Sequence, residues 1–308
     1  MGNIATREAY GKALAELGER YENIVVLDAD LSKSTKTFEF KKKFPERFFN
    51  IGISEQDLMG TAAGFATCGK IPFASTFAMF AAGRAFEQVR NSIAYPNLNV
   101  KIAATHAGIT VGEDGASHQA IEDIAIMRAI PDMTVINPSD AVTTKKTIEA
   151  VIKYKGPVYI RLGRLAVPVI HNEDVEFEIG KGIVLKEGKD ATIIAIDFMV
   201  HLAMEAADIL KNENIDAHVI DMHTIKPIDK DLIIKSAIKT KAVVTAEEHN
   251  IIGGLGSAVA EVLSEECPTP MVRVGIGDVF GQSGKPADLV EFYKITAKDI
   301  VDAVMKLM

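Results

Sequence analysis

The sequence predicts an α/β protein of two domains, each a mostly parallel sheet flanked by helices. Short apolar runs alternate with longer stretches of helical periodicity, and the runs are nearly continuous instead of alternating with polar residues. Such runs are typical of parallel strands buried on both faces. A length of 308 residues also exceeds what one hydrophobic core usually serves, which favours two domains.

The first series of predicted strands follows an amphipathic helix expected over residues 5–20. Its members are Ile24–Leu27, Phe48–Ile51, Ile71–Ala74, Val100–Thr105, Thr134–Asn137 and Val158–Arg161. Helical stretches separate them, as crossovers between parallel strands require. We expect this half, residues 1–175, to form the first domain.

A second series of strands is predicted at Ala191–Ile196, Ala217–Ile220, Ala242–Ala246 and Met271–Val274. Between the two series, Leu165–Lys181 contains Pro168 and lacks helical periodicity. Segments of this kind often connect domains, so residues 176–308 are expected to form the second domain.

Composition and charge exclude several classes of protein. A formal net charge of −8 argues against a broad surface for nucleic acid or anionic membranes, and no uncharged apolar run reaches 18 residues. The predicted first helix carries acids, unlike a signal sequence. Cys68 and Cys267 share no metal-ligand spacing and cannot form a disulfide framework, so we expect a cytoplasmic protein.

A polar loop between apolar segments, residues 105–123, predicts the rim of an active site. It holds His106 and His118, four acids and three glycines. Histidines serve in acid–base catalysis, the acids Glu113 and Asp114 could reach substrate hydroxyls, and glycines let the backbone approach a ligand. A metal site is the competing interpretation, but histidines twelve positions apart without a nearby cysteine fit no common zinc pattern.

Glu55 lies where a predicted strand meets an Ala/Gly-rich helix over Thr61–Thr67. A partly desolvated carboxyl group there could hold or deliver a proton. It could also be an ordinary helix-start acid facing the positive end of the helix dipole. The sequence leaves both interpretations open.

Three aromatic residues, Phe77, Phe80 and Phe86, cluster in a chain that is poor in aromatics. They could stack on a planar ligand, although the i, i+3 spacing also suits an ordinary core stripe. Nearby element ends carry Arg7, Arg161 and Arg164, which could grip a phosphate or simply face solvent.

A glycine-rich turn at Gly253–Gly256 follows a predicted strand and opens a helix. It is not the full dinucleotide-binding fingerprint, so close helix packing explains it at least as well.

Taken together, these segments resemble the C-terminal half of transketolase, in the right order and over essentially the whole chain. The residues that carry the resemblance are Ala5–Arg7, Asp28–Ser32, Gly52–Glu55, Thr76–Phe80, His106–Gln119 and Ile160–Arg161. The first domain would then be a pyrimidine-binding domain and the second the family's C-terminal domain.

The resemblance implies thiamine diphosphate as the cofactor. Glu55 would hydrogen-bond its pyrimidine ring, Phe80 with help from Phe77 would stack on that ring, and Asp30 and Leu31 would lie beside the cofactor. One position departs from the family pattern. Gly83-Arg84 stands where many transketolases place a third aromatic residue.

The resemblance further implies transfer of a two-carbon ketol unit from a ketose phosphate to an aldose phosphate. Xylulose 5-phosphate with ribose 5-phosphate or erythrose 4-phosphate are the substrates that the family suggests. His118 would contact sugar hydroxyls and share in proton transfer. The implied substrate-binding residues are Arg7, Ser34, His106, Asp114 and Arg161, with the arginines and Ser34 around the phosphate.

A partner subunit is the last implication. Transketolases usually carry, ahead of this region, a domain whose Gly-Asp-Gly and downstream Asn motif holds the metal and the diphosphate. We therefore expect a separate N-terminal subunit to hold Mg²⁺ or another divalent ion, with no metal ligands in this chain. Homodimerisation and a symmetric assembly with two copies of each chain follow from the same implication.

Three alternatives remain. The beta subunit of a 2-oxo acid dehydrogenase shares the layout but is not expected to carry the loop Gly112–Gln119. A relative of deoxyxylulose phosphate synthase normally has all three domains in one chain. A non-catalytic regulatory or scaffolding paralogue would need none of the residues Glu55, His106, His118, Arg7 and Arg161.

Overall fold

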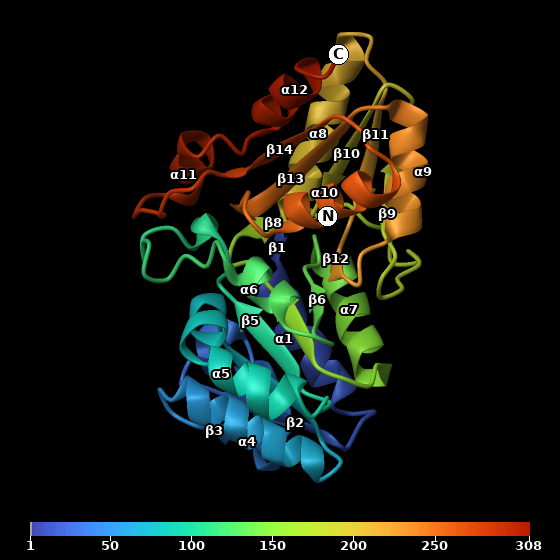
Figure 1. Cartoon of the computed structure of the whole chain (residues 1–308). Coiled ribbons are helices and arrows are strands. Elements are labelled where there is room, and N and C mark those ends of the chain that lie inside the picture. Colours follow the sequence, from blue (N-terminus) through green and yellow to red (C-terminus); the bar gives the residue numbers. More distant parts are fainter. Residues whose placement is uncertain (1) are drawn as a thin grey trace.

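The computed structural model describes residues 2–308. It contains two α/β units, called layers below, each a sheet with its surrounding helices, and they are stacked along the long axis of the molecule (Figure 1). The first contains a seven-stranded sheet in the order β12-β6-β7-β5-β4-β2-β3, and the second a five-stranded sheet in the order β14-β13-β10-β11-β9. Most neighbouring strands are parallel. The predicted fold class is confirmed.

The strands of the first sheet are β2 (Ile24–Asp28), β3 (Phe48–Asn50), β4 (Ile71–Phe77), β5 (Lys101–Thr105), β6 (Thr134–Ile136), β7 (Val158–Arg161) and β12 (Thr224–Lys226). The larger helices around it are α1 (Thr6–Leu17), α4 (Glu55–Thr67), α6 (Asp123–Ala129) and α7 (Ala141–Lys153). Short helical segments fill the connections: α2 (Ser32–Thr35), α3 (Phe38–Lys43), η1 (Pro45–Arg47), η2 (Phe80–Arg84), α5 (Phe86–Gln88), η3 (Val89–Ala94) and η4 (Ile109–Val111).

The strands of the second sheet are β9 (Ile183–Lys186), β10 (Ala191–Ala195), β11 (Ala217–Asp221), β13 (Val243–Asn250) and β14 (Met271–Ile276). Its helices are α8 (Met199–Asn212), α9 (Lys230–Thr240), α10 (Leu255–Glu266), α11 (Pro286–Phe292) and α12 (Ala297–Met305). Asp140 and Thr296 begin α7 and α12 with capping boxes that satisfy free backbone N–H groups of the first turn.

Four short strands are missing from the sequence-based prediction. β1 (Ile4–Ala5) pairs with β8 (Ala166–Val167), β9 is an antiparallel edge strand, and β12 pairs antiparallel with β6. They escape detection because two to four residues carry too little periodicity to read. β12 comes from the second half of the chain but belongs to the first sheet.

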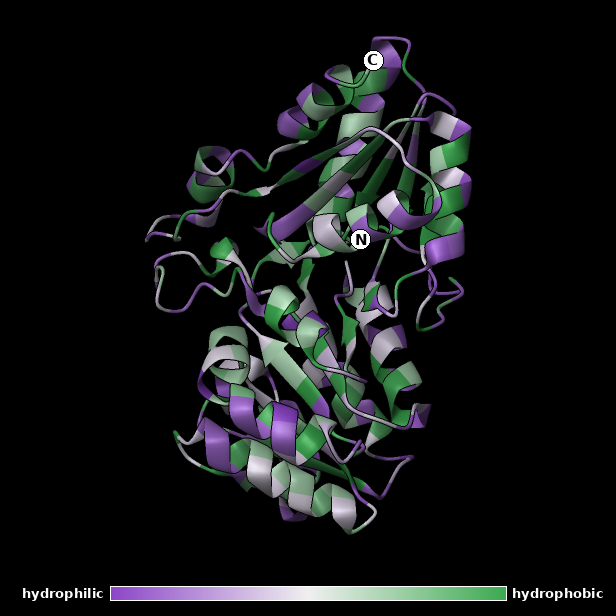
Figure 2. Ribbon diagram, viewed as in Figure 1, coloured by the Kyte–Doolittle hydropathy of each residue, from purple (hydrophilic) through white to green (hydrophobic). Residues whose placement is uncertain are grey.

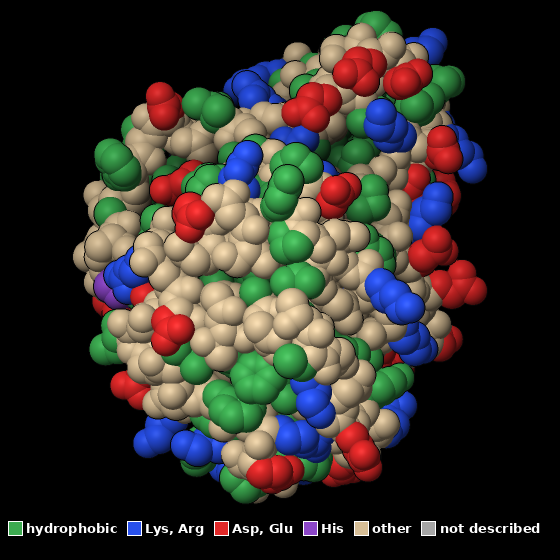
Figure 3. Space-filling model, turned by 60° about the horizontal axis from the view of Figure 1, so that its bottom comes forward, with side chains coloured by type: hydrophobic (Ala, Val, Ile, Leu, Met, Phe, Trp, Pro, Cys, Tyr) green, Lys and Arg blue, Asp and Glu red, His purple; other side chains and the backbone are tan. Residues whose placement is uncertain are grey.

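The hydrophobic core follows the strands, which are largely apolar in Figure 2, while most helices alternate between apolar and polar faces. One buried cluster runs from Val25 in the first half to Leu263 in the second, so the two layers share a continuous core. No helix within residues 2–308 is long and apolar enough to cross a bilayer. On the face in Figure 3, Lys and Arg lie interspersed with Asp and Glu.

Candidate active site

The carboxyl ends of neighbouring parallel strands bring most of the predicted site residues to one edge of the first sheet. The connection after β2 carries Asp30, Leu31 and Ser34, β4 leads into Phe77 and Phe80, and β5 leads into His106. Ligands of open α/β sheets bind at this edge, because the connections there diverge and leave a crevice.

Glu55 is the first residue of α4, and its carboxyl group is buried, with 2% of the side chain exposed. Its partner is Arg84, whose Nη1 lies 2.9 Å from Oε2. Glu55 therefore has the features of both interpretations. It begins a helix, as the structural interpretation expects, and its carboxyl group is buried, as the functional interpretation expects.

The aromatic pair Phe77 and Phe80 stacks with ring centroids 5.7 Å apart and planes at 17°. Two histidines flank this pair. The ring of His106 stacks on Phe77 at 3.9 Å, and that of His118 meets Phe80 edge-on at 5.3 Å. Phe77 is buried while Phe80 is partly exposed, so the pair presents an aromatic face at the sheet edge.

Arg7, at the start of α1, joins the β2 connection to the polar loop. Its Nη1 donates to the carbonyl of Ser34 at 2.9 Å and lies 3.2 Å from Nε2 of His106. Because a guanidinium has no acceptor, Nε2 of His106 accepts and the proton lies on Nδ1, 2.9 Å from Thr105 Oγ1. Burial and the charges of Arg7 and Arg164 lower the pKa of His106 to about 3, so this imidazole is neutral at physiological pH.

Two polar residues to which the sequence reasoning gave no role in the site hold the β2 connection in shape, Asp28, which is buried, and Asn50, which is exposed. Asp28, whose pKa is raised by burial, accepts from the backbone of Leu31 and from the hydroxyls of Thr35 and Thr37. Asn50 exchanges hydrogen bonds with Asp30, which has a positive φ of 61°. The cue in the sequence is a polar residue at or directly after a strand's end.

The prediction that Arg161 binds a substrate phosphate is wrong for this structure. Arg161 is fully buried, and every N–H of its guanidinium donates within the protein, at 2.9 to 3.3 Å, to the side chains of Asp123, Asn137 and Asp197 and the carbonyls of Ala120 and Glu248. Despite burial, the neighbouring carboxylates raise the pKa of Arg161. No donor remains for a ligand, because a guanidinium has only five.

Arg164, three residues later, is the arginine that faces the site. Its side chain is 38% exposed, its guanidinium donates to the carbonyl of Val111, and it lies 3.6 Å from Glu113. Its charge contributes to lowering the pKa values of both Arg7 and His106, which places it beside them. The sequence alone offered Arg164 as a possible phosphate ligand, but the resemblance to transketolase was taken to imply that role for Arg161.

Residues of the second domain hold the polar loop by hydrogen bonds. Nε2 of Gln119 donates to the carbonyl of Gln282, and the backbone N–H of Thr110 donates to Oε1 of Glu248 at 2.6 Å. In Figure 1 the two loops, 105–123 and 277–284, lie side by side at the left. Asp114 is exposed on this loop, and the structure joins it to none of the other predicted site residues.

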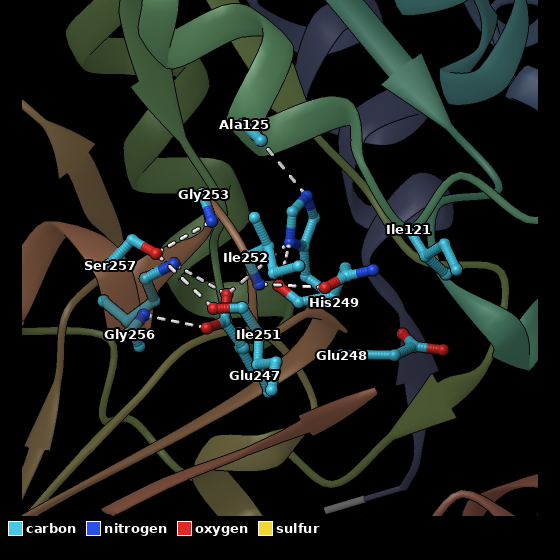
Figure 4. Close-up of polar contacts among 12 residues, drawn as sticks. Ile121, Ala125, Glu247, Glu248, His249, Ile251, Ile252, Gly253, Gly256 and Ser257 are labelled. Carbon is cyan, nitrogen blue, oxygen red and sulfur yellow. Dashed lines mark hydrogen bonds and ion pairs between the residues drawn. The ribbon is translucent and has the colours of Figure 1, made fainter. Parts of the chain in front are cut away.

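The glycine-rich turn at Gly253–Gly256 serves packing, as its incomplete fingerprint suggests. Glu247 accepts hydrogen bonds from the N–H groups of Leu255 and Gly256 at 2.6 and 2.8 Å, and so fills the N-terminus of α10 (Figure 4). A Cβ on Gly254 would lie 2.0 Å from Oε2 of Glu247. A carboxylate of the chain itself thus occupies the place where a phosphate would bind in a nucleotide site.

Comparison with known families agrees with this architecture. The transketolase pyrimidine-binding domain matches residues 2–169, and the transketolase C-terminal domain matches residues 180–300. The chain belongs to the transketolase family. The resemblance inferred from the sequence is therefore confirmed, whereas a division at residue 175 remains a prediction.

Individual relatives in the transketolase family are similar over nearly their full length. A putative transketolase C-terminal section from Methanocaldococcus jannaschii is 56% identical over 305 residues, 98% of this chain and 96% of the relative. A 6-deoxy-6-sulfo-D-fructose transketolase subunit from Clostridium sp. (strain MSTE9) is 44% identical over 297 residues, 96% of this chain and 92% of the relative.

A solved structure described as a split-gene transketolase in an inactive β4 tetramer superposes with a TM-score of 0.93. It is 63% identical, and the match covers 99% of this chain and 98% of that one. The likeness therefore extends over both layers and their relative placement.

Proposed function

We propose that this chain is the C-terminal subunit of a two-chain transketolase that moves a two-carbon ketol unit between sugar phosphates. One observation carries the proposal. A single sheet edge carries the buried carboxyl group of Glu55, the aromatic face of Phe80, and the guanidinium groups of Arg7 and Arg164 with the neutral imidazole of His106. A heterocyclic cofactor and an anionic sugar would bind next to each other there.

The residues fit the pyrimidine half of thiamine diphosphate. That ring is flat and carries nitrogens, and the site offers Phe80 for stacking and a carboxyl group to share a proton with a ring nitrogen. When bound, the cofactor supplies the centre that stabilises a carbanion at the sugar carbonyl carbon. Leu31 and the Asp30–Asn50 pair would border the ring.

The chain's own residues would position the sugar and move protons. Arg7 and Arg164 would bind the phosphate, with the Ser34 segment held in place by Arg7. His106, neutral and fixed in one tautomer, would donate or accept a hydrogen bond without carrying charge. His118, half-exposed beside Phe80 with Nδ1 3.0 Å from Ser117 Oγ, is the proposed acid–base group for the sugar hydroxyls.

An N-terminal subunit would complete the site. Among the described residues there is no group of three or more potential metal ligands, and the proposal assigns the divalent ion and the diphosphate contacts to the partner. The subunit names of relatives and the inactive β4 tetramer of the solved relative support this division of labour. We propose two copies of each chain in the active assembly.

The ketose donor is an anionic sugar, and xylulose 5-phosphate is the proposed one, with ribose 5-phosphate or erythrose 4-phosphate as acceptor. The sulfosugar relative shows why the arginines do not identify the sugar. Sulfonate and phosphate are both oxyanions that a guanidinium binds through paired N–H groups.

The decisive experiment reconstitutes the complex with the N-terminal subunit, thiamine diphosphate and Mg²⁺, and measures ketol transfer from xylulose 5-phosphate to ribose 5-phosphate. Activity is expected only with both chains. Activity of this chain alone at a comparable rate would contradict the proposal, and turnover of a 2-oxo acid instead of a ketose would favour the dehydrogenase alternative.

Glu55→Gln in the same complex is expected to lower kcat about 100-fold or more, because general acid–base contributions of this kind are about 10²–10⁴-fold. Exposed Glu46→Gln is the matched control and is expected to leave kcat unchanged. Full activity of Glu55→Gln would instead support a site without a catalytic role for Glu55, as in the scaffold alternative.

A further inference from the structure

Arg84 reaches back over the aromatic pair that precedes it. It ends the π-helical segment η2, in which the N–H of Ala85 donates to the carbonyl of Phe80 at 3.2 Å. The guanidinium carbon lies 4.2 Å from the ring centroid of Phe80, and Nη1 lies 2.9 Å from Oε2 of Glu55. Wide turns of this type recur at functional sites, because they redirect side chains that a regular helix would carry past them.

We propose that Arg84 is a surrogate ligand, which occupies the place of the cofactor's pyrimidine ring until the cofactor displaces it. The inference rests on the proposed function. A ligand that stacks on Phe80 and also hydrogen-bonds Glu55 must sit where the guanidinium sits. The guanidinium matches that ligand in form, since it is flat, delocalised and donates N–H bonds in its own plane.

The contact with Arg84 opposes the work assigned to Glu55. A carboxyl oxygen that shares a proton with a ring nitrogen must be available for that hydrogen bond, whereas Oε2 of Glu55 already accepts from Nη1 of Arg84 at 2.9 Å. Glu55 therefore performs its proposed role only after Arg84 has moved away. In the cofactor-free chain, however, the same ion pair stabilises a carboxylate that would otherwise be buried without a partner.

The local structure allows Arg84 to leave without unfolding. Its side chain is 49% exposed, and its carbonyl stays anchored by Nε2 of Gln56 at 3.3 Å. The cofactor can bind only the fraction of molecules in which Arg84 has moved away from Glu55 and Phe80. Because the contacts of Arg84 make that fraction small, they lower the apparent affinity for the cofactor in proportion to it. Removing Arg84 thus has opposite effects on the stability of the free chain and on cofactor binding.

The first test is thermal unfolding of the chain alone, with Arg84→Gln, Glu55→Gln and the double variant. We expect Arg84→Gln to lower Tm by a few degrees and to lower it much less when Glu55→Gln is already present. Arg90→Gln, exposed and bonded to Asn91, is the control and should leave Tm unchanged. Additive effects of the two variants would overturn the inference, because they would show no coupling between the side chains.

The second test is calorimetric binding of thiamine diphosphate with Mg²⁺ to the complex reconstituted with the N-terminal subunit. We expect the Arg84→Gln complex to bind roughly three- to thirty-fold more tightly than the unaltered complex, and Arg84→Lys, which keeps the charge but not the plane, to fall between them. Equal or weaker binding by Arg84→Gln would overturn the inference and show that Arg84 does not compete with the cofactor or helps to hold it.

Absence of cofactor binding by both complexes would overturn the proposed function and this inference with it. That outcome differs from failure of the inference alone, in which the unaltered complex binds the cofactor but Arg84→Gln brings no gain. The stability measurements need no cofactor, so they report on the Glu55–Arg84 contact in either case.

Discussion

Arg161 and Arg164 show how strongly position within a short segment decides what an arginine does. Arg161 ends β7 inside the junction of the two layers, surrounded by Asp123, Asn137 and Asp197. Arg164 lies three residues further along, where the chain has left the sheet, and its side chain is partly exposed. Sequence reasoning found both arginines but could not tell them apart, because burial depends on partners distant in sequence.

The two arginines therefore predict opposite phenotypes. Arg161→Met removes one partner from a buried network and is expected to destabilise the chain by about 3–5 kcal/mol. Arg164→Met is expected to change stability by less than about 1 kcal/mol but to raise KM for the phosphorylated ketose at least 10-fold in the reconstituted complex. Urea unfolding followed by circular dichroism and steady-state kinetics check these values. A stable, active Arg161→Met variant would contradict the assignment.

Among the elements, the loop after β5 depends on a glycine for its contact with the second layer. Gly108 has φ of +78°, and a Cβ there would lie 2.1 Å from the carboxyl carbon of Glu248. The sequence predicted that glycines would let this loop approach a ligand closely. The structure shows that Gly108 lets it approach the carboxyl group of Glu248 in the second domain.

Gly108→Ala is expected to destabilise the chain by about 2–4 kcal/mol, since both the backbone conformation and the contact are unfavourable for a side chain. Gly64→Ala, inside α4 with open space around its Cα, is the matched control and should stabilise by about 0.5–1 kcal/mol. Urea unfolding of both variants measures the difference. A Gly108→Ala chain as stable as the parent would show that Glu248 can move aside.

At the level of the elements, the long parallel strands were predictable and the short antiparallel ones were not. β2, β4 and β5 were predictable because each contains a run of three or four consecutive apolar residues. The placement of Glu55, Phe80 and His106 at one sheet edge was predictable too, because each follows a predicted strand, while their roles remain predictions. The Glu55–Arg84 pair was not, since it depends on the π-helical geometry of η2.

The whole molecule carries buried acids whose ionisation couples stability to pH. Burial raises the pKa of Glu248 from 4.5 to about 8, with a further contribution from Asp197. A raised pKa means that the folded chain holds this proton more tightly than the unfolded chain. The contribution to stability is therefore complete below about pH 4.5 and is lost as the pH rises to about 8.

Below about pH 6.5 the buried histidines oppose this effect, so the net fall in the free energy of unfolding is expected between about pH 6.5 and 8. The slope there is up to about 1.4 kcal/mol per pH unit for each such proton. Glu248→Gln mimics the protonated acid and is expected to flatten this slope, while exposed Glu265→Gln should not. Urea unfolding followed by circular dichroism suits a chain without tryptophan. An unchanged slope in Glu248→Gln would contradict the assignment. His106 and His249, with pKa values lowered by burial to about 3 and 4, act in the opposite direction only below about pH 6.5.

β12 gives the molecule a property that neither sheet has alone. These three residues lie some fifty positions beyond the end of the predicted first domain, yet they cover the outer edge of β6. A fragment ending at residue 175 would expose that edge, and open strand edges recruit other chains. By pairing with β6, β12 from the second half of the chain thus prevents other chains from adding to that edge of the first sheet.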